Sequence, residues 1–343
     1  MKLKQFQSYL KKQKIDLAIL NESDVNTTYF TQIKPSYSLL LIGQRTANLY
    51  LTKLDKIPDL KEFKVKVLEK GWEKKLNKNV KRIGLNYASV TMNGSRRIKR
   101  LFPKAKFSDI SKQLNKLRTT KTEQECKCIN QACKITDYAF SEMLKNIRKL
   151  KTEQQVADFI DRKFKEKGAE SAFPTIVAMG KNAAVPHHLT SNQKLKRGFL
   201  LLDFGAKYKY YCADMSRTIF LGTPKKQEIE MYNLLLNAQE QAIKESSQVK
   251  TFFELDQLVR KQLGKYSSHF IHSLGHGLGL EIHESPSDIK ESKQEIKPGH
   301  VFTIEPGVYF PGKFGIRIED TVIYNDKVKV LTKSKKELVC VKI

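Results

Sequence analysis

Short apolar runs alternate with polar, helix-like stretches through the first 117 residues of the chain. Runs of strand length occupy residues 16–20, 38–42, 47–51 and 82–85, and the second and third are separated by a connection of hairpin length. Helical patterns occupy residues 6–13 and 94–102, and the second of these ends before Pro103. Strands and helices that alternate at this spacing predict a small α/β domain over residues 1–117.

A change of pattern near residues 112–122 indicates a domain boundary, because the stretch 117–121 is polar and shows no periodicity. Thr122 with Glu125 fits a capping box, and the apolar residues that follow recur at helical spacing as far as Met143. The same pattern recurs at Thr152 and Thr251. Gly-punctuated strands lie between and after these helices, so residues 118–343 are predicted to form a second domain, of α+β class.

Charge and composition narrow the classes of function. The 343 residues include 63 Lys and Arg against 36 Asp and Glu, a net charge of +27 that is steeper in residues 1–117 (26 against 9) than afterwards (37 against 27). The basic residues are scattered as pairs without a recognisable binding motif, so nucleic acid is not favoured as a partner. No apolar run approaches the ~18 residues of a membrane span, and the N-terminus lacks the apolar core of a signal peptide. We therefore expect a cytoplasmic protein that does not associate with membranes, with its five cysteines reduced.

Two acidic residues interrupt apolar, strand-like segments. Asp203 lies in the segment 200–205, and Asp214 lies in the segment 212–218. A hairpin that turns at Tyr208-Lys209 would place these two carboxylates opposite each other. Like charges in that position destabilise a sheet unless a cation lies between them, so the pair indicates a metal site.

A second hairpin has the same symmetry. Pro311-Gly312-Lys313 is a turn signal, and a hairpin centred on Gly312 would bring Glu305 opposite Glu319. The sequence thus predicts a second facing carboxylate pair.

Histidines are concentrated in the segment from His272 to Glu284. His272 and His276 stand four residues apart, as in the zinc motif H-E-x-x-H, but Ser273 replaces the glutamate and three glycines within 275–279 argue against a helix. Glycine at this density permits close approach of the backbone, often beside a ligand.

Four carboxylates with one or two imidazoles make a donor set that is mostly oxygen. Such a set favours two hard or borderline divalent ions, Mn²⁺ before Co²⁺ or Zn²⁺. Two cations ~3.5–4 Å apart would balance the four acids, activate a shared water and polarise a carbonyl group.

These segments resemble those of the M24 metallopeptidases, the pita-bread family of Xaa-Pro aminopeptidases, prolidases and methionine aminopeptidases. The resemblance spans essentially residues 118–343 and includes residues 173–178 and 182–187 beside the acidic and histidine segments, in the family's order. Residues 1–117, with Asn26-Thr27-Thr28-Tyr29-Phe30, resemble the creatinase/prolidase N-terminal domain, which simple methionine aminopeptidases lack. The resemblance implies an α/β creatinase-like domain followed by a pita-bread catalytic domain, a proline-containing peptide as substrate, and a homodimer.

Carried over residue by residue, the resemblance implies a dinuclear metal site. Asp203 would chelate one ion, Asp214 and Glu319 would bridge both ions, and His276 and Glu305 would complete the shell of the second ion.

The resemblance also implies roles toward the substrate. Glu305 would act as a proton shuttle, while His187 and His283 would hydrogen-bond the substrate and the developing oxyanion. His272 would line the proline-side pocket, and Arg317 would support the bridging glutamate and close the site.

The favoured activity is that of an Xaa-Pro aminopeptidase, in which a metal-bridging water or hydroxide attacks the bond between an N-terminal residue and a following proline. The motifs do not separate this activity from that of a prolidase, which cleaves only Xaa-Pro dipeptides. A third alternative is a non-catalytic pita-bread module that binds other molecules. Such a module is expected to lack metal ligands, and here all five are present.

Overall fold

The computed structural model describes residues 2–21 and 24–342, and the chain divides into two compact units, residues 1–118 and 119–343. The division falls in helix α4 (Ser111–Thr119), which the sequence pattern did not predict. Leu114 and Leu117 are the buried apolar residues of this helix, and two such positions are too few to make a helical period visible.

The first unit is built on a six-stranded mixed sheet with the order β4-β3-β2-β1-β5-β6. Its strands are β1 (Leu17–Asn21), β2 (Ser38–Gly43), β3 (Ala47–Leu51), β4 (Lys64–Val67), β5 (Arg82–Leu85) and β6 (Lys106–Asp109). The predicted hairpin of β2 and β3 is confirmed, with Ile42 paired to Ala47. The edge strands β4 and β6 were not predicted, because each has at most two apolar residues in four.

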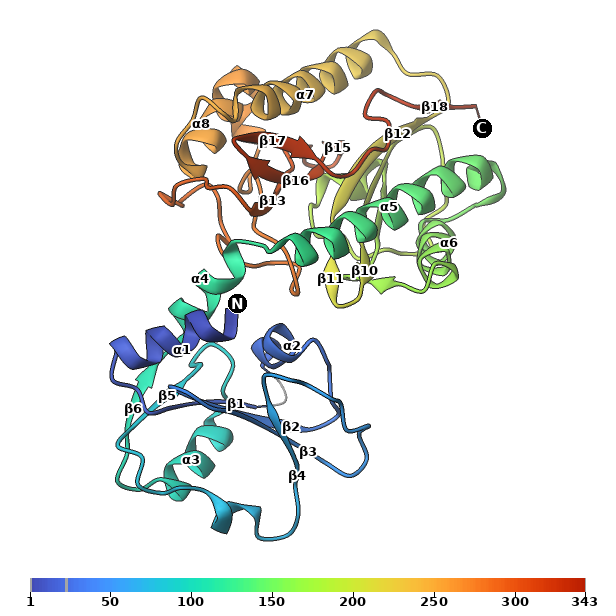
Figure 1. The fold of residues 1–343 in the computed structure, drawn as a ribbon. Helices are drawn as coiled ribbons and strands as arrows, with labels where there is room; N and C mark the ends of the chain where they lie inside the picture. The colour runs from blue at the N-terminus through green and yellow to red at the C-terminus, as the bar shows by residue number, and fades with distance from the viewer. Residues whose placement is uncertain (1, 22–23, 343) are drawn as a thin grey trace. The chain divides into compact units, whose positions relative to one another are not determined.

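Helices cover both faces of this sheet. α1 (Lys2–Lys12) and α2 (Val25–Thr31) lie on one face and α3 (Met92–Leu101) lies on the other (Figure 1). A short 3-10 turn, η1 (Trp72–Lys75), lies between β4 and β5 in the sequence. Side chains alternate between the two faces along a strand. Ile19 and Leu41 lie on the face that α3 covers, where they share a core cluster with Ile98.

The second unit contains the remaining strands in four small sheets, ordered β11-β10-β7, β18-β12-β9-β8, β13-β16-β17 and β14-β15. The strands of its first half are β7 (Glu170–Ser171), β8 (Ile176–Met179), β9 (Gly198–Phe204), β10 (Ala206–Tyr208), β11 (Tyr211–Cys212) and β12 (Met215–Leu221). Those of its second half are β13 (His300–Ile304), β14 (Gly307–Phe310), β15 (Phe314–Arg317), β16 (Asp320–Asn325), β17 (Lys327–Val330) and β18 (Cys340–Val341).

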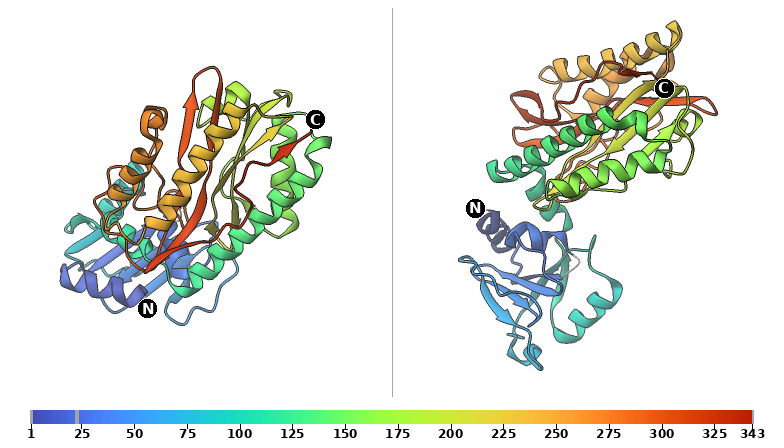
Figure 2. Two further views of the ribbon diagram at one scale, coloured as in Figure 1. Left: turned by 90° about the horizontal axis from the view of Figure 1, so that it is seen from above. Right: turned by 90° about the vertical axis from the view of Figure 1, so that its right-hand side faces the viewer.

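Helices enclose these strands from two sides. α5 (Glu123–Asn146) and α6 (Glu153–Glu166) lie on one side, and α7 (Lys226–Glu245) and α8 (Phe252–Leu263) lie on the other (Figure 2). Short 3-10 turns are η2 (Ile147–Lys149), η3 (Gly180–Ala184) and η4 (Gly264–His269). Each helix pair closes a core of its own, one around Phe204 and the other around Phe302. Within the described residues, no helix combines the length and apolar character that crossing a membrane requires.

The predicted capping boxes are confirmed at two of three helix starts. Thr122 and Thr251 each exchange hydrogen bonds with the glutamate three residues later. At Thr152 the hydroxyl accepts from the backbone N–H of Gln155, but the Gln155 side chain accepts from Lys151 instead, so the reciprocal bond is missing.

The two predicted hairpins differ in accuracy. The second is confirmed, since Gly307 pairs with Arg317 and Ile304 pairs with Asp320, which is the register centred on Gly312. The first turns at Lys209-Tyr210 and not at Tyr208-Lys209, so Asp203 pairs with Ser216.

The turn residues account for this shift of register. Lys209 and Tyr210 both have positive φ, at 45° and 73°, as a two-residue type I′ turn requires. Neither residue type is typical of that conformation, so the sequence did not reveal the position of the turn.

A buried ion pair ties the beginning of the second unit to the segment of His283. Lys121 Nζ lies 3.1 Å from Glu284 Oε2, and the two side chains are 1% and 2% exposed. The other oxygen of Glu284 accepts the backbone N–H of Leu280 at 2.9 Å. This pair holds the segment in place only while both charges are present.

Replacing Lys121 with methionine should therefore destabilise the protein by about 3–5 kcal/mol, because the change removes the cation of a buried ion pair. The double variant Lys121→Met with Glu284→Gln should lose clearly less, since it removes both charges of the pair. Urea denaturation measures both. Equal losses in the single and double variants would contradict this explanation.

Candidate metal centre

The four predicted acids lie where strand pairs end or change partners. Asp203 is near the end of β9, and Asp214 lies between β11 and β12. Glu305 separates β13 from β14, and Glu319 separates β15 from β16. Asp214, Glu305 and Glu319 lie outside the paired strands, whereas Asp203 is still paired with Ser216. All four carboxylates line one cavity.

Short polar contacts connect the segments that carry these acids. The Thr321 hydroxyl accepts from the backbone N–H of Asp214 at 3.0 Å and donates to its carbonyl at 2.7 Å. The backbone N–H of Glu319 donates to the carbonyl of Ser216 at 3.1 Å. The two hairpins are thereby joined directly beside the acids.

The segment of His276 is joined to strand β13 in the same way. The backbone N–H of His276 donates to the Thr303 hydroxyl at 3.1 Å, and the backbone N–H of Thr303 donates to the carbonyl of His276 at 2.9 Å. The approach is so close that a Cβ added at Gly275 would lie 2.2 Å from the Thr303 carbonyl oxygen. The close backbone approach predicted from the glycines is confirmed.

The imidazole of His276 faces two of the carboxylates. Its Nε2 lies 3.5 Å from Asp214 Oδ2 and 3.4 Å from Glu305 Oε1. Asp214, His276 and Glu319 each offer a ligand atom, and these three atoms lie within 4.8 Å of one another. All three residues are buried, so this cluster is a candidate site for a metal ion.

Three carboxylate oxygens of the cluster are buried without a hydrogen-bond donor among the described residues: Asp203 Oδ1, Asp214 Oδ1 and Glu319 Oε1. Buried polar atoms are normally satisfied, and oxygens left in this state are suited to a cation. The donor set of four carboxylates and an imidazole is that of hard or borderline divalent ions. The residues present therefore fit a metal centre.

Burial and mutual repulsion change the acidity of the cluster. Burial, and then the charges of Asp203 and Glu305, raise the pKa of Asp214 well above its usual value. Burial, and then the charge of Asp214, do the same to the pKa of Glu319. Burial also raises the pKa of Glu305. Without cations these groups hold protons more readily than ordinary carboxyls.

Arg317 places a positively charged side chain against the cluster. Its Nη2 forms an ion pair with Asp203 Oδ2, and its Nε donates to the Ser216 hydroxyl at 2.7 Å. That hydroxyl donates in turn to Glu319 Oε2 at 2.7 Å. Arg317 thus reaches Glu319 through Ser216.

A chain of hydrogen bonds runs from Arg317 to His272. Arg317 Nη1 donates to the Tyr309 hydroxyl at 2.8 Å, and this hydroxyl lies 2.9 Å from His272 Nε2. The other ring nitrogen of His272 lies 2.7 Å from the Ser273 carbonyl, which can only accept. His272 therefore carries its proton on Nδ1 and accepts from Tyr309 at Nε2. Burial, and then the charge of Arg317, lower the pKa of His272 to about 3, which keeps the ring neutral.

All nine predicted site residues line a single cavity of about 650 Å³ within the second unit. They are Asp203, Asp214, His276, Glu305, Glu319, His187, His272, His283 and Arg317. The rings of His276 and His283 lie 4.2 Å apart between centroids. Partial burial, and then the charges of His276 and His187, lower the pKa of His283 to about 4.

Sequence reasoning missed Ser216, Thr303 and Tyr309. Ser216 lies two residues after Asp214, and Thr303 lies two residues before Glu305, so the strand period of two would have placed each beside its acid. His188, interpreted as an ordinary surface or structural residue, also lines the cavity and binds the buried Glu153 at 3.0 Å.

Comparison with known proteins identifies the family of the chain. The sequence profile of metallopeptidase family M24 matches residues 127–326, which is more than half of the chain. The chain belongs to metallopeptidase family M24. The profile of the creatinase/prolidase N-terminal domain matches residues 2–120. The fold is accordingly a creatinase-type N-terminal domain followed by the pita-bread domain of the M24 family.

Individual M24 relatives match nearly the whole chain. The Xaa-Pro dipeptidase of Pyrococcus furiosus is 35% identical over 323 residues, which cover 92% of each chain. The crystal structure of the Pyrococcus horikoshii prolidase covers 98% of this chain and 99% of its own, with a TM-score of 0.88 and 31% identity. The X-Pro aminopeptidase of Thermotoga maritima covers 96% and 98%, with a TM-score of 0.87 and 32% identity.

Metal binding should stabilise this M24 protein, and Asp214→Asn should remove most of that effect. In the metal-free protein, carboxyls with raised pKa values contribute stability at low pH that is lost as pH rises through those values, and a cation removes this repulsion. At a Mn²⁺ concentration of about 100 times Kd the stabilisation is about 2.7 kcal/mol, or roughly 5–10 °C in Tm.

Thermal unfolding at neutral pH, with Mn²⁺ and with a chelator, measures the effect. Glu291→Gln, which alters an exposed carboxylate, is the control and should keep the full rise in Tm. The same rise in Asp214→Asn would show that the ion binds elsewhere.

Proposed function

We propose that this protein is an Xaa-Pro dipeptidase, a prolidase that uses two divalent metal ions. The observation that carries the proposal is the 35% identity to the Pyrococcus furiosus Xaa-Pro dipeptidase over 92% of both chains, N-terminal domain included. A second dipeptidase, from Pyrococcus horikoshii, is 34% identical over 98% of both chains. These relatives support the dipeptidase better than the aminopeptidase that the sequence alone favoured.

Five residues would hold the two ions: Asp203, Asp214, His276, Glu305 and Glu319. The unsatisfied oxygens of Asp203, Asp214 and Glu319 support this assignment, as does the proximity of His276 to Asp214 and Glu305. When bound, the ions would supply an activated water and polarise the scissile carbonyl. Mn²⁺ stays the favoured ion on the basis of the donor set.

The remaining residues would bind and orient the peptide and move its protons. Glu305 is proposed to take up a proton and pass it toward the proline nitrogen, a role that suits a buried carboxyl with a raised pKa. His187 and His283 are proposed to hydrogen-bond the substrate and the developing oxyanion. His272 would present a neutral ring to the proline side. Arg317 would act mainly by holding Asp203 and Ser216, since three of its nitrogens are already engaged.

Assays with Ala-Pro and Ala-Pro-Ala in the presence of Mn²⁺ test the substrate class. The dipeptide should be hydrolysed with a kcat/KM at least roughly tenfold higher, a difference of about 1.4 kcal/mol in the barrier. Ala-Ala serves as the control for proline and should be a poor substrate. Comparable turnover of the tripeptide would reject the dipeptidase in favour of the aminopeptidase, which the likeness to the Thermotoga maritima enzyme keeps as the second candidate.

Replacing Glu305 with glutamine should lower kcat on Ala-Pro by roughly 10²–10⁴, because the amide cannot take up the proton. Bound metal should be measured on the same preparation. A lower kcat with the bound metal retained supports proton transfer by Glu305. A lower kcat that is explained by lost metal would assign Glu305 only the role of a ligand. Undiminished kcat would contradict both roles.

A further inference from the structure

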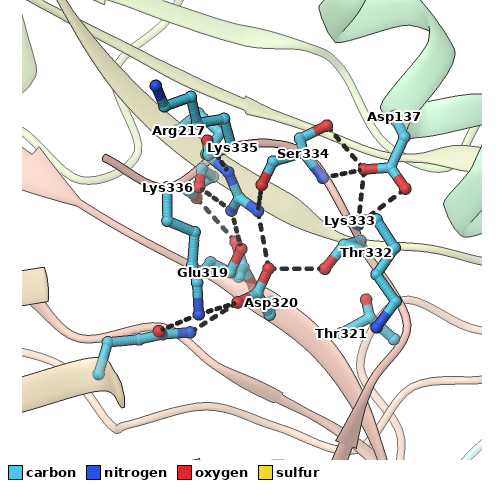
Figure 3. Close-up of polar contacts among 12 residues, drawn as sticks. Asp137, Arg217, Glu319, Asp320, Thr321, Thr332, Lys333, Ser334, Lys335 and Lys336 are labelled. Atoms are coloured by element: carbon cyan, nitrogen blue, oxygen red, sulfur yellow. Dashed lines mark hydrogen bonds and ion pairs between the residues drawn. The ribbon is translucent and has the colours of Figure 1, made fainter. Parts of the chain in front are cut away.

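Strands β12 and β16 carry a second charged network, centred on Arg217 and Asp320, on the face that points away from the acid cluster (Figure 3). Neighbouring residues of a strand point to opposite faces. The Ser216 hydroxyl therefore meets Glu319 Oε2 on the cavity side, whereas Arg217 Nη2 meets Asp320 Oδ1 at 2.8 Å on the other side. The Arg217 and Asp320 side chains are 1% and 0% exposed.

Arg217 uses every donor that a guanidinium group has. A guanidinium presents five N–H groups in one rigid plane. Their acceptors are the carbonyl of Lys335 at 3.1 Å, the carbonyls of Ser216 at 2.9 Å and Glu319, Asp320 Oδ1 at 2.8 Å and the carbonyl of Ser334 at 2.9 Å. Two of these acceptors belong to the backbone of Ser216 and Glu319. Arg217 thus holds together Ser216 and Glu319, whose side chains are hydrogen-bonded to each other.

Asp320 is the counterpart of Arg217 in this network. Its Oδ1 also accepts from the Thr332 hydroxyl at 2.8 Å, while its Oδ2 accepts from Gln239 of α7 at 2.8 Å and pairs with Lys336 at 3.2 Å. The carboxylate and the guanidinium are therefore both fully compensated, which a buried pair requires.

The network also includes the segment Thr332–Lys336, which we name the C-terminal strap. Besides its bonds to Arg217 and Asp320, the strap is held by Asp137 of α5, which accepts the backbone N–H groups of Lys333 and Ser334 at 2.8 Å (Figure 3). The pair of Arg217 and Asp320 thus connects strands β12 and β16 with helix α7, and the strap connects this pair with helix α5.

We propose that Arg217 and Asp320 are positioning residues of the metal centre, acting with the C-terminal strap. They hold the carbonyls of Ser216 and Glu319 at the spacing at which the Ser216 hydroxyl can bind the Glu319 carboxylate. Arg317 donates to the same hydroxyl from the cavity side, so a shift of the two strands would change the contacts of both groups. This inference rests on the proposed metal-dependent function.

The variant Arg217→Lys tests the proposal, because lysine keeps the charge beside Asp320 but lacks the planar set of five donors. Isothermal titration of metal-stripped protein with Mn²⁺ should show binding weakened roughly 10–100-fold, the usual effect of losing a residue that orients metal ligands. On Ala-Pro, kcat should fall while KM stays within about twofold, because no group that contacts substrate is altered.

The matched control is Tyr232→Phe, which removes a hydrogen bond from the Tyr232 hydroxyl to the strap carbonyl of Lys336 and leaves Arg217 untouched. Both variants should unfold at lower urea concentration, but only Arg217→Lys should lose Mn²⁺ affinity. If Arg217→Lys does not fold, Thr332→Val removes one donor to Asp320 and should weaken Mn²⁺ binding several-fold, or about 1 kcal/mol at 1.4 kcal/mol per tenfold.

The results distinguish failure of the positioning role from failure of the proposed function. Wild-type affinity and kcat in Arg217→Lys, or equal loss of affinity in Tyr232→Phe, would show that the network serves stability alone while the proposed function stands. Wild-type protein that binds no Mn²⁺ would overturn the proposed function and, with it, the positioning role.

Discussion

The crowding of four carboxylates in one cavity, two of them buried and two partly buried, is the constraint on which the rest of the second unit depends. Asp214 and Glu319 are 4% and 1% exposed. Burial and the charges of Asp203 and Glu305 raise the pKa of Asp214, and burial and the charge of Asp214 raise the pKa of Glu319. Repulsion among such groups is far stronger than in water, so the arrangement persists only where protons or cations balance it. The raised pKa values and the unsatisfied oxygens are two consequences of the same fact, and both indicate a cation site.

The surrounding fold keeps these acids together against their repulsion. The hydroxyls of Thr303, Thr321 and Ser216 connect the chain segments that carry His276, Asp214 and Glu319. Glycines allow the His276 segment to approach β13 more closely than any residue with a Cβ could. On the far face, Arg217 and Asp320 satisfy each other and the adjacent backbone. The acids are therefore constrained from both faces of the same strands. The basic excess is steepest in residues 1–117, and none of the described residues that line the cavity of the acids belongs to this range.

Sequence predicted which residues gather around one cavity better than it predicted the details of the fold. Acids within apolar strands are visible in a sequence because they contradict the apolar pattern, and all nine candidates lie around one cavity. Helix α4 and strands β4 and β6 were missed because a few apolar residues do not define a period. Ser216, Thr303 and Tyr309 were missed because hydroxyls are common on strands and carry no cost that would mark them. The choice between dipeptides and longer peptides has no motif of its own, so relatives were needed to favour one.

The wrong register of the first hairpin explains why the site prediction tolerated an error in the fold. Asp203 was expected opposite Asp214 but pairs with Ser216, a shift of two residues. Side chains alternate with a period of two, so a shift by two keeps every residue on its face, whereas a shift by one would have turned Asp214 away from the cavity. The residue that this shift brought opposite Asp203 is the serine that binds Glu319. In the second hairpin the register was right, and the acids lie where two ladders with the same register, β13–β16 and β14–β15, are interrupted. The face of the sheet to which a side chain points thus depends only on whether its position is odd or even along the strand, which the sequence shows. The exact pairing of residues depends on the conformation of the turn, which the residue types of Lys209 and Tyr210 do not predict.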